Sequence, residues 1–351
     1  MNRTKLTVHH SLDRKLSLIP ETMITATKPT PTSTMERDPA HIVLAGGTGT
    51  MGRILQRHFV AQGWRVTVLT RRPEAHSRDE VSFVHWDGRS VGPWSALLDS
   101  ADVLVNLAGR SVDCRYTEHN KAAILNSRVD ATNALGLAMD ECTTPPTLWI
   151  NLSSATVYRH AEDREMDEET GELGRDFSPQ VVLAWEKAFF GHQRNGLRQV
   201  AVRCAMVFSH EGGAFPRFVQ LVKAGLGGHH GPGTQYVSWV HEADVARFFQ
   251  WVIDTSAIHG VINLAAPCPV TDRTLTRALR ERIRPLVALP TPVPLLHLGS
   301  FVLRTEVELV LKSRRVVPMR ALYHGFAFTH PTLANALDEL LPTNSTSKPC
   351  T

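Results

Sequence analysis

The chain has 351 residues, 42% of them hydrophobic, and a formal net charge of +4. This length and apolar content suit a large globular protein rather than one small domain. The charge is small for the length and the Lys and Arg residues are scattered, so we expect no nucleic-acid partner. No apolar run reaches the length of a membrane span, so we expect no membrane partner either.

The first forty residues differ in composition from the rest. Residues 1–40 are rich in Thr, Pro and basic residues and show no sustained period, which predicts a disordered extension. A transit peptide is the alternative interpretation and would place the protein in an organelle. The five cysteines are widely spaced, which is typical of free thiols in a reducing compartment, so we expect a cytoplasmic protein.

The most informative segment follows, at 42–52. An apolar run leads into a glycine-rich turn, and apolar residues then recur at helical spacing from Met51. Strand, glycine turn and helix form the entry unit of dinucleotide-binding folds, in which the helix N-terminus binds a pyrophosphate. The alternative is a glycine-rich turn in another α/β sheet. The residues expected to contact the cofactor here are Gly46, Gly47, Thr48, Gly49, Thr50, Met51 and Gly52.

Further strands and helices alternate along the chain. The strands are expected at 65–70, 81–87, 102–107, 148–154, 200–208 and 261–265. Helices are expected from Pro93 and over 117–139, 178–187, 271–283 and 301–312. This alternation predicts an α/β fold with a doubly wound, parallel Rossmann-type sheet, which binds its ligand beyond the carboxyl ends of the strands.

The chain divides into two predicted domains. The nucleotide-binding domain is expected over 41–208 and also takes in about 241–266. From residue 209 the pattern becomes loop-rich, with several Gly and Pro residues before 234. We expect a smaller C-terminal α+β substrate lobe over 209–341 and a frayed tail at 342–351.

The end of the second strand predicts which nicotinamide cofactor is bound. An NAD site places an acidic residue there to bond the ribose 2′-OH, whereas this strand ends in Arg71 and Arg72. A guanidinium suits a phosphate, so the sequence favours NADP(H) over NAD(H). The alternative is a solvated basic loop.

Other strand ends are expected near the cofactor. Asp87 should lie near the adenine, and Leu107, Ala108 and Gly109 should pass under the adenosine ribose and the diphosphate. Asn126 and Arg128 on the long helix could reach the crevice or belong to an ordinary solvated face.

Three segments, 46–49, 106–109 and 153–158, together resemble the extended short-chain dehydrogenase/reductase superfamily. The closer resemblance, over roughly 41–341, is to an atypical epimerase-like branch with a C-terminal segment of unknown function, here 285–341. The motifs that carry it lie at 184–186, 225–228, 231–235, 238–241, 263–267, 317–318 and 325–326. The resemblance implies a Rossmann-type domain, a bound nicotinamide cofactor and a C-terminal lobe forming the other wall of the crevice. By analogy it also suggests a homodimer.

The resemblance implies a catalytic Ser, a Tyr and a Lys four residues after the Tyr. Ser154 stands at the position of the Ser, and its neighbour Ser153 is expected to contact the cofactor; strand-end capping is the alternative for both. None of the four tyrosines has a Lys four residues later. In the helix at 178–187, one register places Gln180 and Ala184 at the Tyr and Lys positions, and another places Leu183 and Lys187 there.

Three explanations remain open for the missing phenol. Another group replaces it, with Tyr158, Glu186, His241 and Asp244 as candidates; or the substrate needs little acid assistance; or the protein binds its cofactor without turnover. Packing or local pairing is the structural alternative for each candidate. The paired histidines at 9–10 and 229–230 lack further ligands at metal-binding spacing, so no metal site is expected. The sequence thus predicts an NADP(H)-dependent oxidoreductase or epimerase acting on a small carbonyl or sugar-like substrate, or alternatively a non-catalytic NADP(H)-binding sensor or assembly protein.

Overall fold

The computed structural model describes residues 39–75, 80–287, 289 and 311–342. Three predictions concern segments that lie wholly or mostly outside these ranges. They are the extension at 1–40, the helix at 301–312 and the tail at 342–351.

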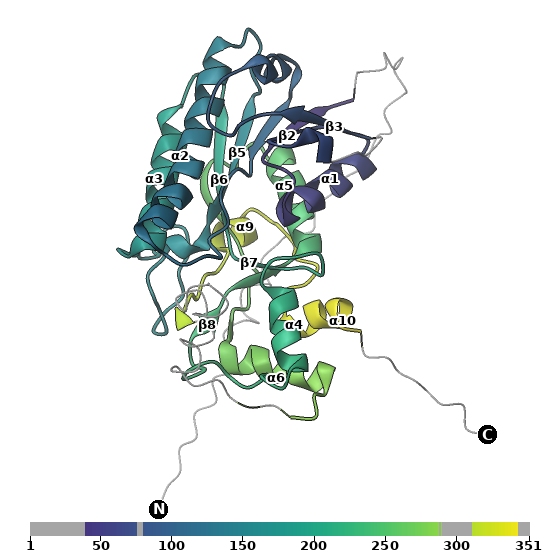
Figure 1. The fold of residues 1–351 in the computed structure, drawn as a ribbon, viewed down its shortest axis with the longest axis vertical. Coiled ribbons are helices and arrows are strands. Elements are labelled where there is room, and N and C mark those ends of the chain that lie inside the picture. Colours follow the sequence, from purple (N-terminus) through teal and green to yellow (C-terminus); the bar gives the residue numbers. More distant parts are fainter. Residues whose placement is uncertain (1–38, 76–79, 288, 290–310, 343–351) are drawn as a thin grey trace, which may run out of the picture. The chain divides into compact units, whose positions relative to one another are not determined.

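A seven-stranded parallel sheet organises the described chain, in the order β10-β6-β5-β4-β1-β2-β3 (Figure 1). Each neighbouring pair is parallel, and the order turns back on itself at β1, so the predicted doubly wound sheet is confirmed. Its strands are β1 His41–Ala45, β2 Arg65–Thr70, β3 Val81–His85, β4 Val103–Asn106, β5 Leu148–Ser154, β6 Arg198–Cys204 and β10 Gly260–Leu264.

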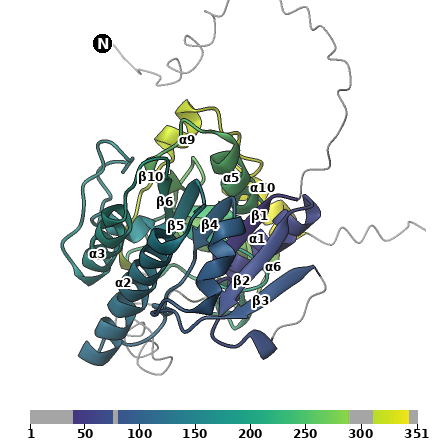
Figure 2. The ribbon, with the colours of Figure 1, turned by 90° about the horizontal axis from the view of Figure 1, so that it is seen from above.

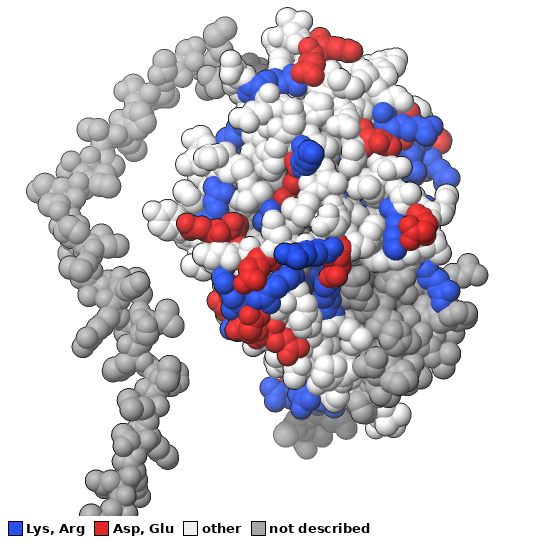
Figure 3. Space-filling model, turned by 90° about the vertical axis from the view of Figure 1, so that its left-hand side faces the viewer, with Lys and Arg blue, Asp and Glu red and all other residues white. Residues whose placement is uncertain are grey.

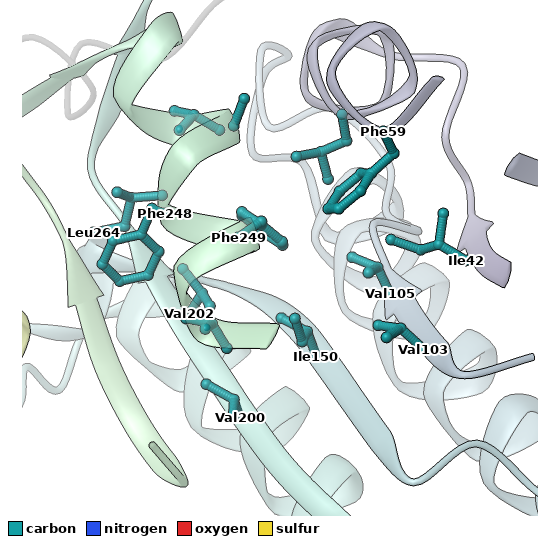
Figure 4. Close-up of a cluster of buried hydrophobic side chains, with 14 of the residues drawn as sticks. Ile42, Phe59, Val103, Val105, Ile150, Val200, Val202, Phe248, Phe249 and Leu264 are labelled. Carbon is teal, nitrogen blue, oxygen red and sulfur yellow. The ribbon is translucent and has the colours of Figure 1, made fainter. Parts of the chain in front are cut away.

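One face of the sheet is covered by α1 (Thr50–Ala61) and α5 (Glu242–Asp254). Figure 4 shows Phe59 of α1 and Phe248 and Phe249 of α5 pointing toward the Val and Ile side chains of the strands. All three rings are fully buried. Burial of this apolar surface stabilises the layer by roughly 25 cal/mol per Å².

The opposite face is covered by α2 (Glu118–Glu141), α3 (Phe177–Gly191) and the 3₁₀ helix η2 (Pro93–Ser100). Figure 2 shows α2 and α3 side by side on one side of the sheet, with α1 and α5 on the other. Trp149 of β5 packs edge-to-face against Phe189 of α3, with 4.8 Å between ring centroids. Because both faces are covered, each residue of β1 is buried, as its continuous apolar run predicts.

The second half of the chain differs from its prediction in two places. The single strand expected at 200–208 is broken at Ala205: β6 stays in the main sheet, whereas β7 (Met206–Phe208) pairs with β9 (Trp239–His241). The segment after it also contains a helix, α4 (Phe215–Lys223), that the glycines on either side obscured. Its apolar face packs into a separate core with Trp239 and the helices that follow.

The other helices and strands are short, apart from α6 and α10, which contribute side chains to that core. They are η1 (Pro73–Ala75), η3 (Ala155–Val157), β8 (Tyr236–Val237), β11 (Val270–Thr271), α6 (Asp272–Ile283), α9 (Met319–Tyr323) and α10 (Leu333–Leu340). On the face seen in Figure 3, acidic and basic side chains lie interspersed in small groups. In the described part of the chain, no helix has the length and apolar character needed to cross a membrane.

Alanine substitutions at Gly49 and Gly52 test whether close packing requires a glycine at each position. A Cβ at Gly52 would lie 1.8 Å from the carbonyl oxygen of Gly47, whereas a Cβ at Gly49 meets nothing within 4 Å. We therefore expect Gly52→Ala to lower the free energy of unfolding by about 3 kcal/mol or more, because backbone must move. Gly49→Ala is expected to change it by less than about 1 kcal/mol. Urea unfolding of the cofactor-free chain measures both, and equal effects would contradict this account.

Candidate cofactor and active site

The glycine turn after β1 touches the loop after β4. Gly46 has a φ of +80°, and a Cβ there would lie 2.7 Å from Cα of Ala108. Two backbone bonds hold the strand ends: the amide of Gly46 donates to Leu69, and the amide of Leu107 donates to Ala45. The predicted cofactor segments at 46–52 and 107–109 are therefore neighbours in the structure.

The first turn of α1 presents amides that are capped by no side chain of the residues that the structure describes. Gly49 at the N-cap offers no side chain, and the first turn contains no acidic residue. Side chains of α1 instead bind the carbonyl groups of the turn: Arg53 donates to the carbonyl of Thr48 at 3.0 Å, and Gln56 donates to that of Gly47 at 2.7 Å. Free amides and a helix dipole favour an anion at this position.

The other predicted cofactor residues lie at neighbouring strand ends. Arg71 and Arg72 are exposed directly after β2, and no ion pair within the described ranges involves either. Asp87 is also exposed and caps its own loop, since its carboxylate accepts bonds from the amides of Arg89 and Ser90.

Asn106, at the end of β4, is a residue to which sequence reasoning gave no role of its own. Its side chain is fully buried, donates to Thr132 and Asn151, and accepts the amide of Ala108 at 3.0 Å. It thereby holds the 107–109 loop in place. The signal was present in the sequence, because an Asn that ends an apolar strand must find buried partners.

Ser153 and Ser154 end β5 but face different partners. Ser153 is buried and donates to Oε1 of Glu186 at 2.6 Å. Ser154 is half-buried, and its Oγ accepts bonds from the amide and the hydroxyl of Thr156. No acceptor for the Ser154 hydroxyl proton occurs among the residues that the structure describes, so this group has a donor to offer.

Two of the predicted proton donors, Glu186 and Tyr158, belong to one buried network. Arg203 of β6 binds both carboxylate oxygens of Glu186, at 2.9 and 2.7 Å, and donates to the hydroxyl of Tyr158 at 3.2 Å. That hydroxyl donates to Asn263 of β10 at 2.9 Å. Burial raises the pKa of Tyr158, whose side chain is 0% exposed.

Arg203 was not identified from the sequence as a site residue, although its position there indicates a buried partner. It stands in the apolar run 200–208, where a charge must find a buried partner. The network spans β5, β6, β10 and α3, and it fixes the backbone on which Ser154 sits.

The helix α3 shows what occupies the positions expected for a Tyr and a Lys. In the first register, Gln180 is exposed and Ala184 is half-buried. Leu183 of the second register is half-buried and packs against the cluster that includes Val157 and Tyr158. Lys187, the basic residue of the second register, is exposed.

His241 and Asp244, the other candidates, both lie at the start of α5, and the carboxylate of Asp244 accepts the amides of Thr329 and His330. Nδ1 of His241 accepts the amide of Ala243, so in the neutral ring Nε2 carries the proton. That Nε2 lies 4.0 Å from Glu339, which with His330 completes a cluster close enough for a metal ion. The cap uses the lone pair of Nδ1, and the proton on Nε2 leaves that nitrogen without a lone pair for a metal ion. His241 is therefore arranged as a helix cap and not as a metal ligand. Burial lowers its pKa, and the neighbouring His330 adds to the effect.

A parallel, doubly wound sheet with an uncapped glycine turn at its first strand defines the Rossmann-type class of proteins. Within that class, the model of the NAD dependent epimerase/dehydratase family matches residues 42–265, and a domain of unknown function matches 291–340. The chain belongs to the NAD dependent epimerase/dehydratase family, as the resemblance predicted.

Relatives from bacteria and mammals align over most of the chain. An epimerase family protein of Bacillus subtilis, YfhF, is 29% identical over 87% of this chain and 99% of its own length. One from Staphylococcus saprophyticus is 32% identical over 86% and 99%. The human epimerase family protein SDR39U1, crystallised with NADPH, is 28% identical with a TM-score of 0.76, covering 86% of this chain and 99% of that structure.

The buried ion pair generates a test of the network. Glu186→Gln leaves the Arg203 guanidinium buried without a counter-charge, so we expect the free energy of unfolding to fall by about 3–5 kcal/mol. The matched control is Glu172→Gln, because Glu172 forms a solvent-screened surface pair with Arg159 at 2.9 Å, so its loss should cost much less. Denaturant unfolding of both variants distinguishes the sites, and a cost at Glu186 no larger than at Glu172 would show that the network is not stabilising.

Proposed function

We propose that this protein binds NADP(H) at the carboxyl edge of the sheet and uses NADPH to reduce a small carbonyl substrate. In the epimerase form of this proposal, a sugar-like alcohol would be oxidised by NADP+ and reduced again by the NADPH so formed, which leaves the cofactor unchanged overall. The observation that carries the proposal is the uncapped N-terminus of α1 on a glycine turn that a side chain would fill. That cradle fits a dinucleotide diphosphate. The NADPH bound to the human relative supports the same assignment.

The choice of NADPH rests on the end of β2. Arg71 and Arg72 are exposed there and have no carboxylate partner in the ranges described. Two guanidiniums can bind a 2′-phosphate through charge-assisted hydrogen bonds. The loop 107–109 would lie beside the diphosphate and Asp87 beside the adenine.

Ser154 is the residue that we propose to orient the carbonyl. Its hydroxyl proton has no acceptor among the described residues, and its backbone follows Ser153, which the buried network holds. Ser153, Glu186 and Tyr158 then act as positioning residues, because each is engaged by another buried side chain. When bound, NADPH supplies the hydride. The Ser154 hydroxyl donates a hydrogen bond to the substrate oxygen, and the alkoxide that hydride transfer leaves on this oxygen would take its proton from solvent.

A second candidate function, a non-catalytic NADPH-binding sensor or assembly protein, is favoured by one observation. Leu183 of α3, one of the two positions at which the Tyr is expected, packs against an apolar cluster, and Tyr158, the phenol nearest in sequence to the serines, is fully buried. Such a protein would bind the cofactor tightly and turn over nothing.

Cofactor preference is tested by calorimetry on the full chain. We expect NADPH to bind at least about tenfold more tightly than NADH, which is about 1.4 kcal/mol. Changing Arg71→Glu together with Arg72→Glu should abolish that preference, because the phosphate loses its cations and meets two carboxylates. Arg277→Glu, on the exposed face of α6, is the control. Equal binding of both nucleotides by the unaltered chain would refute the 2′-phosphate site.

Turnover separates the enzyme from the sensor. NADPH oxidation is followed by absorbance against a panel of small carbonyl compounds. If the protein is an enzyme, Ser154→Ala should lower kcat by about 10²-fold or more, in the range typical of a positioned proton donor, while leaving NADPH affinity unchanged. Tight NADPH binding with no turnover of any member of the panel would instead support the sensor.

A further inference from the structure

Arg128 of α2 lies over the backbone that follows β4. A Cβ added at Gly109 would be 3.1 Å from its Cζ and 3.4 Å from its Nε, so the missing side chain makes room for the guanidinium. The strand β4 pairs with β5, matching Asn106 with Asn151. Arg128 therefore stands at the same edge of the sheet as Ser154.

The guanidinium is held at one end only. Its Nη1 donates to the carbonyls of Arg110 and Ile124, both at 3.0 Å, and its Cζ lies 5.2 Å from the ring centroid of Trp185. Trp185 is itself fixed by a bond from its Nε1 to Thr132. No acceptor for Nε or Nη2 of Arg128 occurs within the described ranges, so that edge of the fork is available.

Arg128 also lacks a counter-ion. No carboxylate of the described residues forms an ion pair with it, although burial lowers its pKa to about 10. A cation that is desolvated without a partner carries an energetic cost that an anionic ligand would relieve. Arg203, which is buried at this edge, shows the arrangement that half-buried Arg128 does not have: its Nε and Nη2 bind the two carboxylate oxygens of Glu186.

We propose that Arg128 binds the carboxylate of the substrate through its Nε and Nη2, so that the substrate is an anionic carbonyl compound. This inference rests on the proposed function, because it places the carbonyl at Ser154. The planar fork matches the two oxygens of a carboxylate. A phosphate oxygen of the cofactor diphosphate would offer related chemistry, so the test must distinguish the two sources.

The test uses a pair of probes that differ in charge but hardly in size. Oxamate, a carboxylate, and oxamide, its neutral amide, are titrated by calorimetry into the full chain saturated with NADPH. We expect oxamate to bind to the unaltered chain, and to bind at least about tenfold more weakly to Arg128→Gln. Arg128→Lys should also weaken binding, because an ammonium cannot form the fork. Arg277→Gln should bind oxamate like the unaltered chain.

NADPH affinity serves as the second readout and as the check on folding. In Arg128→Gln, the dissociation constant of NADPH should stay within about twofold of that of the unaltered chain, because the proposal assigns the guanidinium to the substrate and not to the cofactor. Three results would overturn the proposal. Arg128→Gln could bind oxamate as tightly as the unaltered chain does, or the unaltered chain could bind oxamate no more tightly than oxamide. The third is that Arg128→Gln loses affinity for NADPH and keeps its affinity for oxamate. The last result would assign Arg128 to the cofactor diphosphate. Failure of the unaltered chain to bind NADPH would refute the proposed function alone, and oxamate titration of the cofactor-free chain would then still decide the role of Arg128.

Discussion

The structure depends on one close contact, the approach of α1 to the turn that precedes it. Gly52 allows the helix to rest directly on the carbonyl of Gly47, and Gly46 allows the turn to touch Ala108. Side chains at these two positions would push the helix and the β4 loop away from the end of β1. Because the contact is made by backbone on both sides, the amides that open α1 are held where an anion can reach them. The proposed nucleotide site is thus a consequence of packing.

A second constraint is electrostatic and acts on the neighbouring strands. The ion pair of Glu186 and Arg203 is nearly enclosed, with each side chain about 8% exposed. A buried pair contributes less net stability than its geometry suggests, but it tolerates few alternative arrangements. Here the pair joins α3 to β6, and Glu186 also accepts the hydroxyl proton of Ser153. Of the two serines, Ser154 is therefore the one whose hydroxyl can donate to a ligand. Arg128 is the contrasting case, with the same side chain at the same edge and no carboxylate paired with it among the residues described.

Most of the sheet could be predicted because its strands are short apolar runs separated by helical patterns and glycines. The strand near 200–208 could not be divided by pattern, since Ala205 is as apolar as its neighbours and only the competing partners β10 and β9 break it. The helix α4 was missed for a related reason: its apolar stripe is short, and its flanking glycines resemble those of a loop. The pairing of Glu186 with Arg203, 17 residues apart, follows no local spacing and depends on how α3 crosses the sheet.

The amino-acid sequence by itself determined the fold class, the glycine turn, the arginines after β2 and the position of the serines, because each depends on local pattern or on residue type. The tertiary structure alone decided which polar groups neutralise one another. Tyr158 and Glu186 are equally plausible as acids in the sequence, yet contacts with distant segments give each a buried partner. A side chain's chemistry depends on its desolvation and its neighbours, and these are set only when distant segments pack together.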